Sequence, residues 1–160
     1  MDVRTDPRAL PTVPELAAML DHSVLKPTQG EHDVVDACAI ARREHIASVV
    51  VKPFYVPLTA RLLQGTSVGR STVIGFPHGG QSPEVKISTA ATALRDGANE
   101  LDMVINIGAL VDGDLKTVER EIASIVGLDA LEMIAAGASR LGTSSTAAIL
   151  DELRRRRGEL

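Results

Sequence analysis

The stretch that decides the fold is ELDMVINIG at residues 100–108, which is apolar, rich in β-branched side chains and bounded by glycines. Such a run is typical of a buried strand. Because side chains alternate along a strand, Asp102, Val104 and Asn106 share one face of it. An ionised, unpaired carboxylate inside a buried strand costs several kcal/mol. Asp102 is therefore a candidate functional residue, and a carboxylate that only ties strand ends together is the alternative.

The rest of the sequence repeats a strand pattern followed by a helix pattern. Strand starts are spaced by roughly 25–30 residues, which predicts βα units in a parallel sheet. The repeat breaks once, between Val126 and Asp129, where Gly127 ends one predicted helix and a second begins without an intervening strand. Residues 1–13 are predicted to be a flexible leader, and residues 14–160 a single domain. The five predicted strands are residues 20–25, 47–52, 71–76, 100–108 and 139–142.

The composition limits the class of protein. The chain has 160 residues and a net charge of −4, so its length predicts one domain and its charge gives no reason to expect nucleic acid. Its single cysteine, Cys38, lies on an apolar helix stripe, which predicts a core residue and fits a reducing compartment. The sequence has neither a run of about 18 apolar residues nor the apolar segment of a signal peptide. We therefore expect a cytoplasmic protein that binds neither nucleic acid nor membrane.

Several segments, taken together, resemble one known family. They are LDHSVLKP at 20–27, VIGFP at 73–77, EVK at 84–86, DGANELDMVINIG at 96–108 and AGASRLGTSS at 136–145. Their order and number resemble deoxyribose-phosphate aldolase, a family of (β/α)8-barrel enzymes. The resemblance covers about residues 15–150, in two blocks.

The resemblance implies a reaction and a set of residues. The family cleaves 2-deoxyribose 5-phosphate to glyceraldehyde 3-phosphate and acetaldehyde without a metal or other cofactor, through a Schiff base on a lysine of the sixth strand. A second lysine, on the seventh strand, helps to keep the first one neutral. Asp102 is similar to the family's proton-relay aspartate, and Asp21 to an acidic residue that lines the same barrel. Gly142, Thr143 and Ser144 resemble the phosphate site, and small residues with hydroxyls before a helix suit an anion independently.

The chain departs from the family in its lysines and its length. None of its lysines lies in the sequence context of either family lysine. A full barrel usually needs about 200–250 residues, and the two matching blocks join near residues 126–129, so strands five to seven of the barrel are expected to be missing. We therefore predict an α/β fold that is a partial TIM (β/α)8 barrel, with about five parallel strands, the last beside the first, and all helices on one side. The four lysines are Lys26, Lys52, Lys86 and Lys116.

The uncovered inner face of this partial barrel is expected to be lined by Asp21, Val50, Ile74 or its neighbours, Asp102 and Val104. A parallel sheet normally has both faces covered, so we expect the chain to associate with itself through this face. Without the family's lysines, we expect no aldolase activity from the chain alone. The alternative functions are a non-enzymatic remnant or interaction module that holds phosphate, and an open-sheet domain with an unrelated ligand.

Other residues have both a functional and an ordinary interpretation. Lys52 ends the second strand and is the outside candidate for a replacement nucleophile, although a solvated strand-end lysine is the commoner case. His22 and His78 have no further metal ligand at a recognisable spacing. The glycine pair at 79–80 forms either a simple turn or part of the substrate mouth. Arg154–Arg157 form either a nucleic-acid patch or, in our preferred interpretation, a basic end that complements a helix dipole.

Overall fold

A computed structural model describes residues 11–135 of the chain. Its four strands form one parallel sheet in the order β1-β2-β3-β4, as predicted for these strands. Asp21, Ser48 and Gly69, which begin β1, β2 and β3, are in register, so these strands start along one edge of the sheet. The predicted strand at 139–142 lies outside the described residues. The strands are β1 (Asp21–Val24), β2 (Ser48–Val51), β3 (Gly69–Ile74) and β4 (Glu100–Met103).

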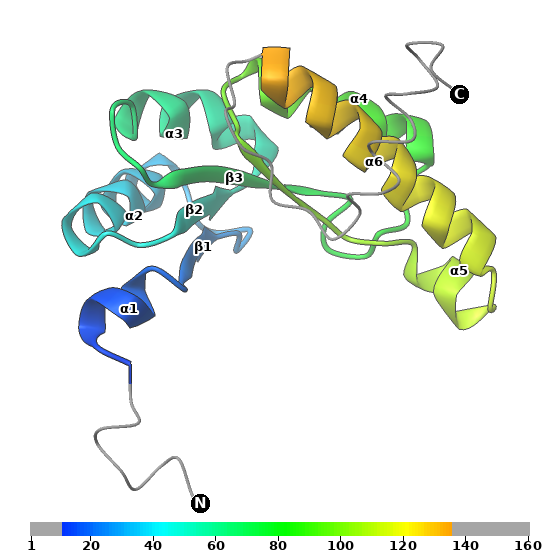
Figure 1. Ribbon diagram of the computed structural model, residues 1–160, viewed down its shortest axis with the longest axis horizontal. Coiled ribbons are helices and arrows are strands. Elements are labelled where there is room, and N and C mark those ends of the chain that lie inside the picture. Colours follow the sequence, from blue (N-terminus) through cyan, green and yellow to red (C-terminus); the bar gives the residue numbers. More distant parts are fainter. Residues whose placement is uncertain (1–10, 136–160) are drawn as a thin grey trace, which may run out of the picture.

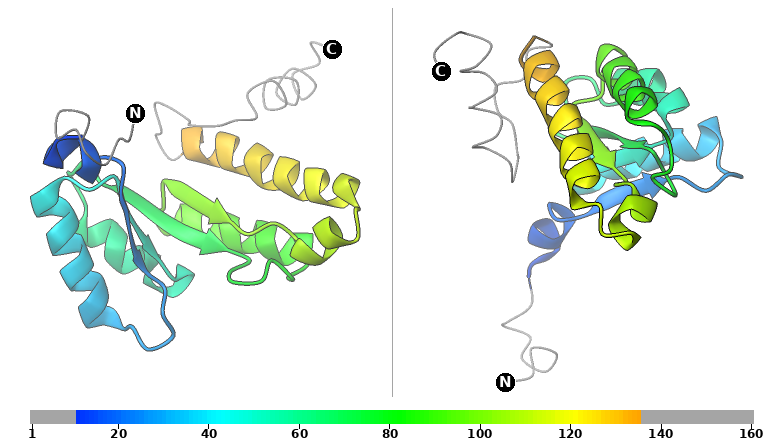
Figure 2. Two further views of the ribbon diagram at one scale, coloured as in Figure 1. Left: turned by 90° about the horizontal axis from the view of Figure 1, so that it is seen from below. Right: turned by 90° about the vertical axis from the view of Figure 1, so that its right-hand side faces the viewer.

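The helices cover one side of this sheet, as the partial barrel predicted. Helices α2, α3 and α4 pack on the sheet, and α6 packs on α4 on the same side (Figure 1). Two further views show that these four helices leave the opposite face of the sheet free of helical cover (Figure 2). The helical elements are α1 (Val13–Ala17), α2 (Glu31–Glu44), the 3-10 turn η2 (Pro53–Tyr55), α3 (Val56–Leu62), α4 (Pro83–Arg95), α5 (Ile107–Val111) and α6 (Leu115–Ala135).

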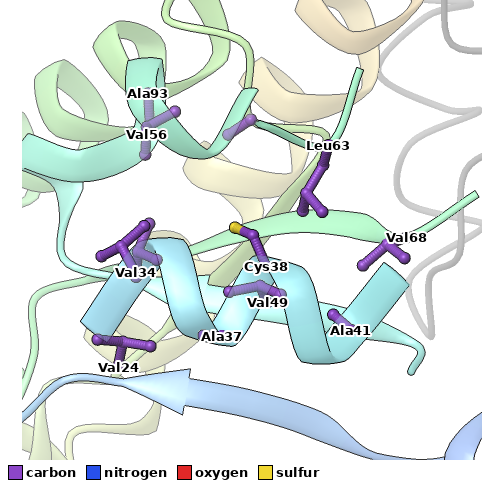
Figure 3. Packing of buried hydrophobic residues seen from close by; sticks show 12 residues of the cluster. Val24, Val34, Ala37, Cys38, Ala41, Val49, Val56, Leu63, Val68 and Ala93 are labelled. Carbon is purple, nitrogen blue, oxygen red and sulfur yellow. The ribbon is translucent and has the colours of Figure 1, made fainter. Parts of the chain in front are cut away.

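The main hydrophobic core lies between the sheet and helices α2 and α3 (Figure 3). Val24 of β1 and Val49 and Val51 of β2 point into it and are at most 1% exposed. Burying such a side chain contributes about 1.5–3 kcal/mol relative to leaving it exposed. Cys38 of α2 packs in the same cluster, and burial raises the pKa of its thiol to about 11. Cys38 is therefore confirmed as a core residue, since a thiol that stays protonated acts as a small apolar group.

Strand β4 is shorter than the apolar run at 100–108 predicted. It ends at Met103, and Asn106 is the N-cap of α5. The Asn106 side chain accepts a hydrogen bond from the Ala109 amide nitrogen at 3.0 Å. Asparagine favours this position because its side-chain oxygen satisfies an amide that has no partner within the helix. The prediction that Asn106 shares a strand face with Asp102 is therefore wrong.

Helix α6 runs without interruption from Leu115 to Ala135, whereas the sequence predicted two helices that meet near Gly127. A glycine inside a helix costs only about 1 kcal/mol relative to alanine. Burial of the apolar side chains Val118 and Ile125 offsets that cost. The predicted deletion junction at 126–129 thus falls inside one continuous helix.

None of the helices within residues 11–135 combines the length and the apolar character that a membrane crossing requires.

Side-chain alternation in β3 decides between Ile74 and its neighbours for the expected inner face. Ile74 is fully buried with Ala90 of α4 and Ile125 of α6, so it belongs to the helix-covered face. Its neighbour Val73 points the other way and is in register with Asp102. The predicted leader falls largely outside the described residues. The predicted phosphate site, Gly142, Thr143 and Ser144, falls wholly outside them.

Candidate functional site

Three carboxylates lie on the side of the sheet opposite the helices. Alternation places Asp21 of β1 and Glu100 and Asp102 of β4 there, because the residues between them point to the helix-covered side. All three are exposed, so the expectation that Asp102 is buried in its strand is wrong. The cause is that β4 is an edge strand of the described sheet, with one side free of helices. We call this surface, formed by Asp21, Ser48, Ser71, Glu100 and Asp102, the carboxylate face.

Asp21 is held by a hydrogen bond between two strands. The Ser48 hydroxyl donates to Asp21 Oδ1 at 2.6 Å, and Ser48 itself is 1% exposed. Because both residues begin their strands, this bond joins β1 to β2 at the end of the sheet where the strands start. The structure thus brings the predicted pair Asp21 and Asp102 to one face of the sheet. They lie, however, on the two outermost strands, β1 and β4.

Glu100 is a member of this face that the sequence reasoning missed. Burial raises its pKa, and the nearby carboxylates of Asp21 and Asp102 raise it further. Its side chain lies over Gly69, where a Cβ atom would stand 2.8 Å from Glu100 Oε2. The absence of a side chain at Gly69 therefore lets the carboxylate turn inward over the sheet. Its position could have been predicted from the sequence, because Glu100 is two residues before Asp102 and residues two apart in a strand share one face.

Ser71 lies in the middle of the carboxylate face. It is in register with Glu100 on one side and Val50 on the other, and it is 1% exposed. Its hydroxyl has no hydrogen-bond partner among the residues that the structure describes. A buried hydroxyl without a partner costs about 1–3 kcal/mol, so it favours a group that would complete its hydrogen bonding.

Lys52 is occupied by contacts that hold a loop in place. Its Nζ donates to the backbone oxygens of Gln29 at 2.7 Å and Lys26 at 3.2 Å, and it lies 5.4 Å from the centre of the Tyr55 ring. Both carbonyls belong to the connection between β1 and α2, and two carbonyl acceptors with an aromatic face suit an ammonium. The amine is therefore directed toward β1, at the opposite edge of the sheet from Asp102.

Lys86 forms the most buried charged contact of residues 11–135. Its Nζ lies 3.0 Å from Glu121 Oε2, and the two side chains are 0% and 1% exposed. Nζ also donates to the Val104 oxygen at 2.9 Å, while the Asn106 amide donates to the same Glu121 oxygen at 3.0 Å. The pair thus joins α4 and α6 to the chain that leaves β4. The signal in the sequence was a lysine four residues before Ala90, on the inner stripe of its helix.

The other predicted candidates are not brought together. His22 and His78 belong to no group of three or more His, Cys, Asp or Glu side chains that could hold a metal within the described part of the chain. Gly79 has a positive φ of 66°, and a Cβ there would overlap the backbone carbonyl of Ile105. The glycine therefore permits close contact between the loop after β3 and the chain after β4.

Comparison with known proteins gives a consistent result. The chain is 44% identical over 111 residues to the deoxyribose-phosphate aldolase of Treponema denticola, a match that spans 69% of this chain and 51% of that protein. It is 47% identical over 111 residues to deoxyribose-phosphate aldolase 1 of Bacillus licheniformis, of which it spans 50%. Over the matched residues, the chain is homologous to deoxyribose-phosphate aldolases. No protein-family model matches it.

The structural comparison agrees with this family. The fold is similar to the tetrameric deoxyribose-phosphate aldolase of Aeropyrum pernix, with a TM-score of 0.70 and 32% identity, over 78% of this chain and 51% of that one. The family predicted from the sequence is therefore confirmed, as is the partial barrel fold. The chain spans about half the length of the curated relatives it matches.

Proposed function

We propose that this chain is an incomplete aldolase barrel that does not cleave 2-deoxyribose 5-phosphate by itself. The observation that carries the proposal is the position of its lysines. The family reaction needs a neutral lysine amine within reach of the substrate carbonyl, in a site that excludes water. All four lysines of the chain lie within residues 11–135, and none places a free amine beside the candidate proton-relay residue Asp102.

The lysines are kept from this role for different reasons. The amine of Lys52 is held by two carbonyls near β1, and that of Lys86 is buried against Glu121. Lys26 lies in the connection after β1, at the far edge of the sheet from Asp102. Lys116 is exposed in the first turn of α6, on the helix-covered side of the sheet.

Asp102 can relay a proton only after an imine forms. We therefore propose that Asp102 and Asp21 are remnants of a substrate-lining face.

Borohydride trapping tests this proposal. The chain is incubated with 2-deoxyribose 5-phosphate, reduced with borohydride and analysed by peptide mass spectrometry, with the Treponema denticola aldolase as the positive control. We expect neither acetaldehyde nor a reduced adduct from the present chain. An adduct on Lys52 that disappears in Lys52→Ala together with turnover, but persists in the matched variant Lys26→Ala, would refute the proposal and restore an active enzyme.

The alternative is a module that holds a phosphorylated sugar without reacting with it. Its support is the sequence at Gly142, Thr143 and Ser144, which precedes a predicted helix. A ligand that binds only the folded chain raises its melting temperature as its concentration increases. Phosphate should then raise the melting temperature of the native chain more than chloride of equal ionic strength does. The additional shift should be lost in Thr143→Ala/Ser144→Ala and kept in Ser67→Ala, and an equal response of all three proteins would contradict phosphate binding.

We also propose that the missing part of the barrel is an internal segment. The support is that residues up to about 126 and residues from about 128 resemble regions that lie far apart in the family, and the proposed junction between them would fall within α6. The lone, buried Cys38 is compatible with a reducing compartment such as the cytoplasm. Sequencing the source DNA across codons 126–129 tests the junction. An additional coding segment at that point would show that the deletion is not a property of the gene.

A further inference from the structure

The carboxylate face has no basic partner within the described part of the chain. The ion pairs within residues 11–135 are His32–Asp36, Arg43–Glu44 and Lys86–Glu121. None of them includes a residue of the carboxylate face. The face also contains the buried, unpartnered hydroxyl of Ser71, in register with Glu100. We propose that Arg154–Arg157, a segment of this chain beyond the described residues, docks on the carboxylate face. This inference goes beyond the proposed function and holds whether or not the chain is an aldolase.

The chemistry of the two segments is complementary. Asp21, Glu100 and Asp102 provide three carboxylates, and the segment Arg154–Arg157 provides four guanidinium groups in a row. Guanidinium has five N–H donors in a planar arrangement that matches carboxylate oxygens, often two at a time. The Ser71 oxygen can accept one further N–H from the same group. An arginine-rich segment would therefore satisfy both the charges and the unpartnered hydroxyl.

The path of the chain brings this segment to the correct end of the sheet. Helix α6 returns from the far end of β4, and its last turns lie beside the start of β4 in Figure 1 and in the left view of Figure 2. This end of α6 lies on the helix-covered side of the sheet, so a segment that follows it must pass around the end of the sheet to reach the carboxylate face. Residues 136–154 can span about 60 Å when extended, which is more than the width of this sheet. Reach therefore does not limit docking within one chain.

The same charges argue against a second copy as the occupant. Two chains that packed carboxylate face to carboxylate face would bring six acidic groups together. Like charges placed opposite each other across an interface cost several kcal/mol. Self-association through this face, which the sequence suggested, would therefore need basic residues from elsewhere. The chain's own arginine segment needs no second molecule and is held at high effective concentration by the intervening residues.

Zero-length cross-linking tests the position of the segment. In the full chain carrying Arg155→Lys, carbodiimide joins the introduced amine to a carboxylate with which it is in contact, and peptide mass spectrometry identifies the pair. We expect links from position 155 to Glu100, Asp21 or Asp102 in the monomer fraction. The matched control carboxylates are Glu31 and Asp36, which are exposed on α2. Links that favour these controls, links found only in dimers, or no link to the carboxylate face would overturn the proposal.

A mutational cycle provides an independent measurement. The change Arg154–Arg157→Gln is combined with Asp21→Asn/Glu100→Gln, and the melting temperature is measured at low and high salt. If the two groups are in contact, their separate shifts do not add, and the difference shrinks at about 1 M salt, where charges are screened beyond about 3 Å. The control replaces Arg43, Arg61, Arg95 and Arg120, four helix arginines, by glutamine with the same change in net charge. Additive shifts for the tail variant, as expected for the control, would refute docking.

Discussion

The two faces of the sheet contain charges in opposite situations. On the helix-covered side, Lys86 and Glu121 are buried together, with further hydrogen bonds from Lys86 Nζ to the Val104 oxygen and from the Asn106 amide to Glu121 Oε2. On the other side, Glu100 and Asp102 are exposed and have no basic partner among residues 11–135. A buried charge without a partner is very costly, whereas an exposed one is solvated. The covered pair is therefore part of the framework, and the exposed carboxylates are the groups available to a ligand or a segment of chain.

The largest effect is expected from breaking the covered pair. Lys86→Met leaves the Glu121 carboxylate buried without its cation, which costs about 3–5 kcal/mol. Urea unfolding of the full chain measures this loss. In Lys86→Met/Glu121→Leu the uncompensated charge is gone, so we expect a smaller loss than in Lys86→Met, although Val104 and Asn106 still lack partners.

A surface pair provides the control for this prediction. Arg43 and Glu44 are 2.6 Å apart, but their side chains are 68% and 46% exposed. Arg43→Met should change the unfolding free energy by less than about 1 kcal/mol, because solvent screens such pairs. If Lys86→Met proved as mild as Arg43→Met, the pair would not be part of the framework.

The next largest effect is expected where the loop after β3 contacts the chain after β4. Gly79→Ala places a methyl group against the Ile105 carbonyl at a φ of 66°, so we expect a loss of about 2–4 kcal/mol from overlap and backbone strain together. Gly65 has a similar φ of 75° but no atom within 4 Å of the added Cβ. Gly65→Ala should therefore show only the strain, about 1–2 kcal/mol. Equal losses in urea unfolding would mean that the close contact contributes nothing.

The sequence predicted the framework better than the site. The βα repeat predicted a parallel sheet, and the resemblance to the aldolase family implied the order of its strands. Right-handed crossovers then placed the helices on one side, and an apolar helix stripe identified Cys38 as a core residue. The sequence predictions failed at Asn106, which caps α5 and does not extend the apolar strand, and at Gly127, where packing of α6 outweighs the low helix propensity of glycine. They left the choice between Ile74 and its neighbours open, because an apolar run does not reveal which of two neighbouring residues faces the helices, and the structure selects Val73 for the inner face.

The charges were harder to predict, because their state depends on contacts between distant segments. Asp102 was expected to be buried, but the edge position of β4 exposes it. Glu100 was missed although it is two residues from Asp102, and its environment depends on Gly69 of another strand. Lys86 was noticed only as part of a family segment, and its partner Glu121 lies 35 residues further along the sequence. The roles of Asp21, Asp102 and Gly142–Ser144 in binding or catalysis stay predictions.

The smallest expected effect compares the pH dependence of one glutamate on each side of the sheet. The pKa of Glu100 is raised, by burial first and then by Asp21 and Asp102, so its ionisation destabilises the folded chain as the pH rises above the ordinary glutamate value of 4.5. The pKa of Glu84, in the first turn of α4, is lowered by hydrogen bonds from its own amide and from Ser82. Its ionisation therefore stabilises the fold above pH 4.5, and that stability is lost as the pH falls.

In the chain with Arg154–Arg157→Gln, no tail arginine can compensate Glu100. In this background Glu100→Gln should raise the melting temperature at pH 7 and leave it unchanged at pH 3. Glu84→Gln in the same background should lower the melting temperature at pH 7 and likewise have no effect at pH 3. The measurement is a series of melting curves between pH 3 and pH 7. If both substitutions shifted the melting temperature at pH 7 in the same direction, the contrast between the two faces would be contradicted.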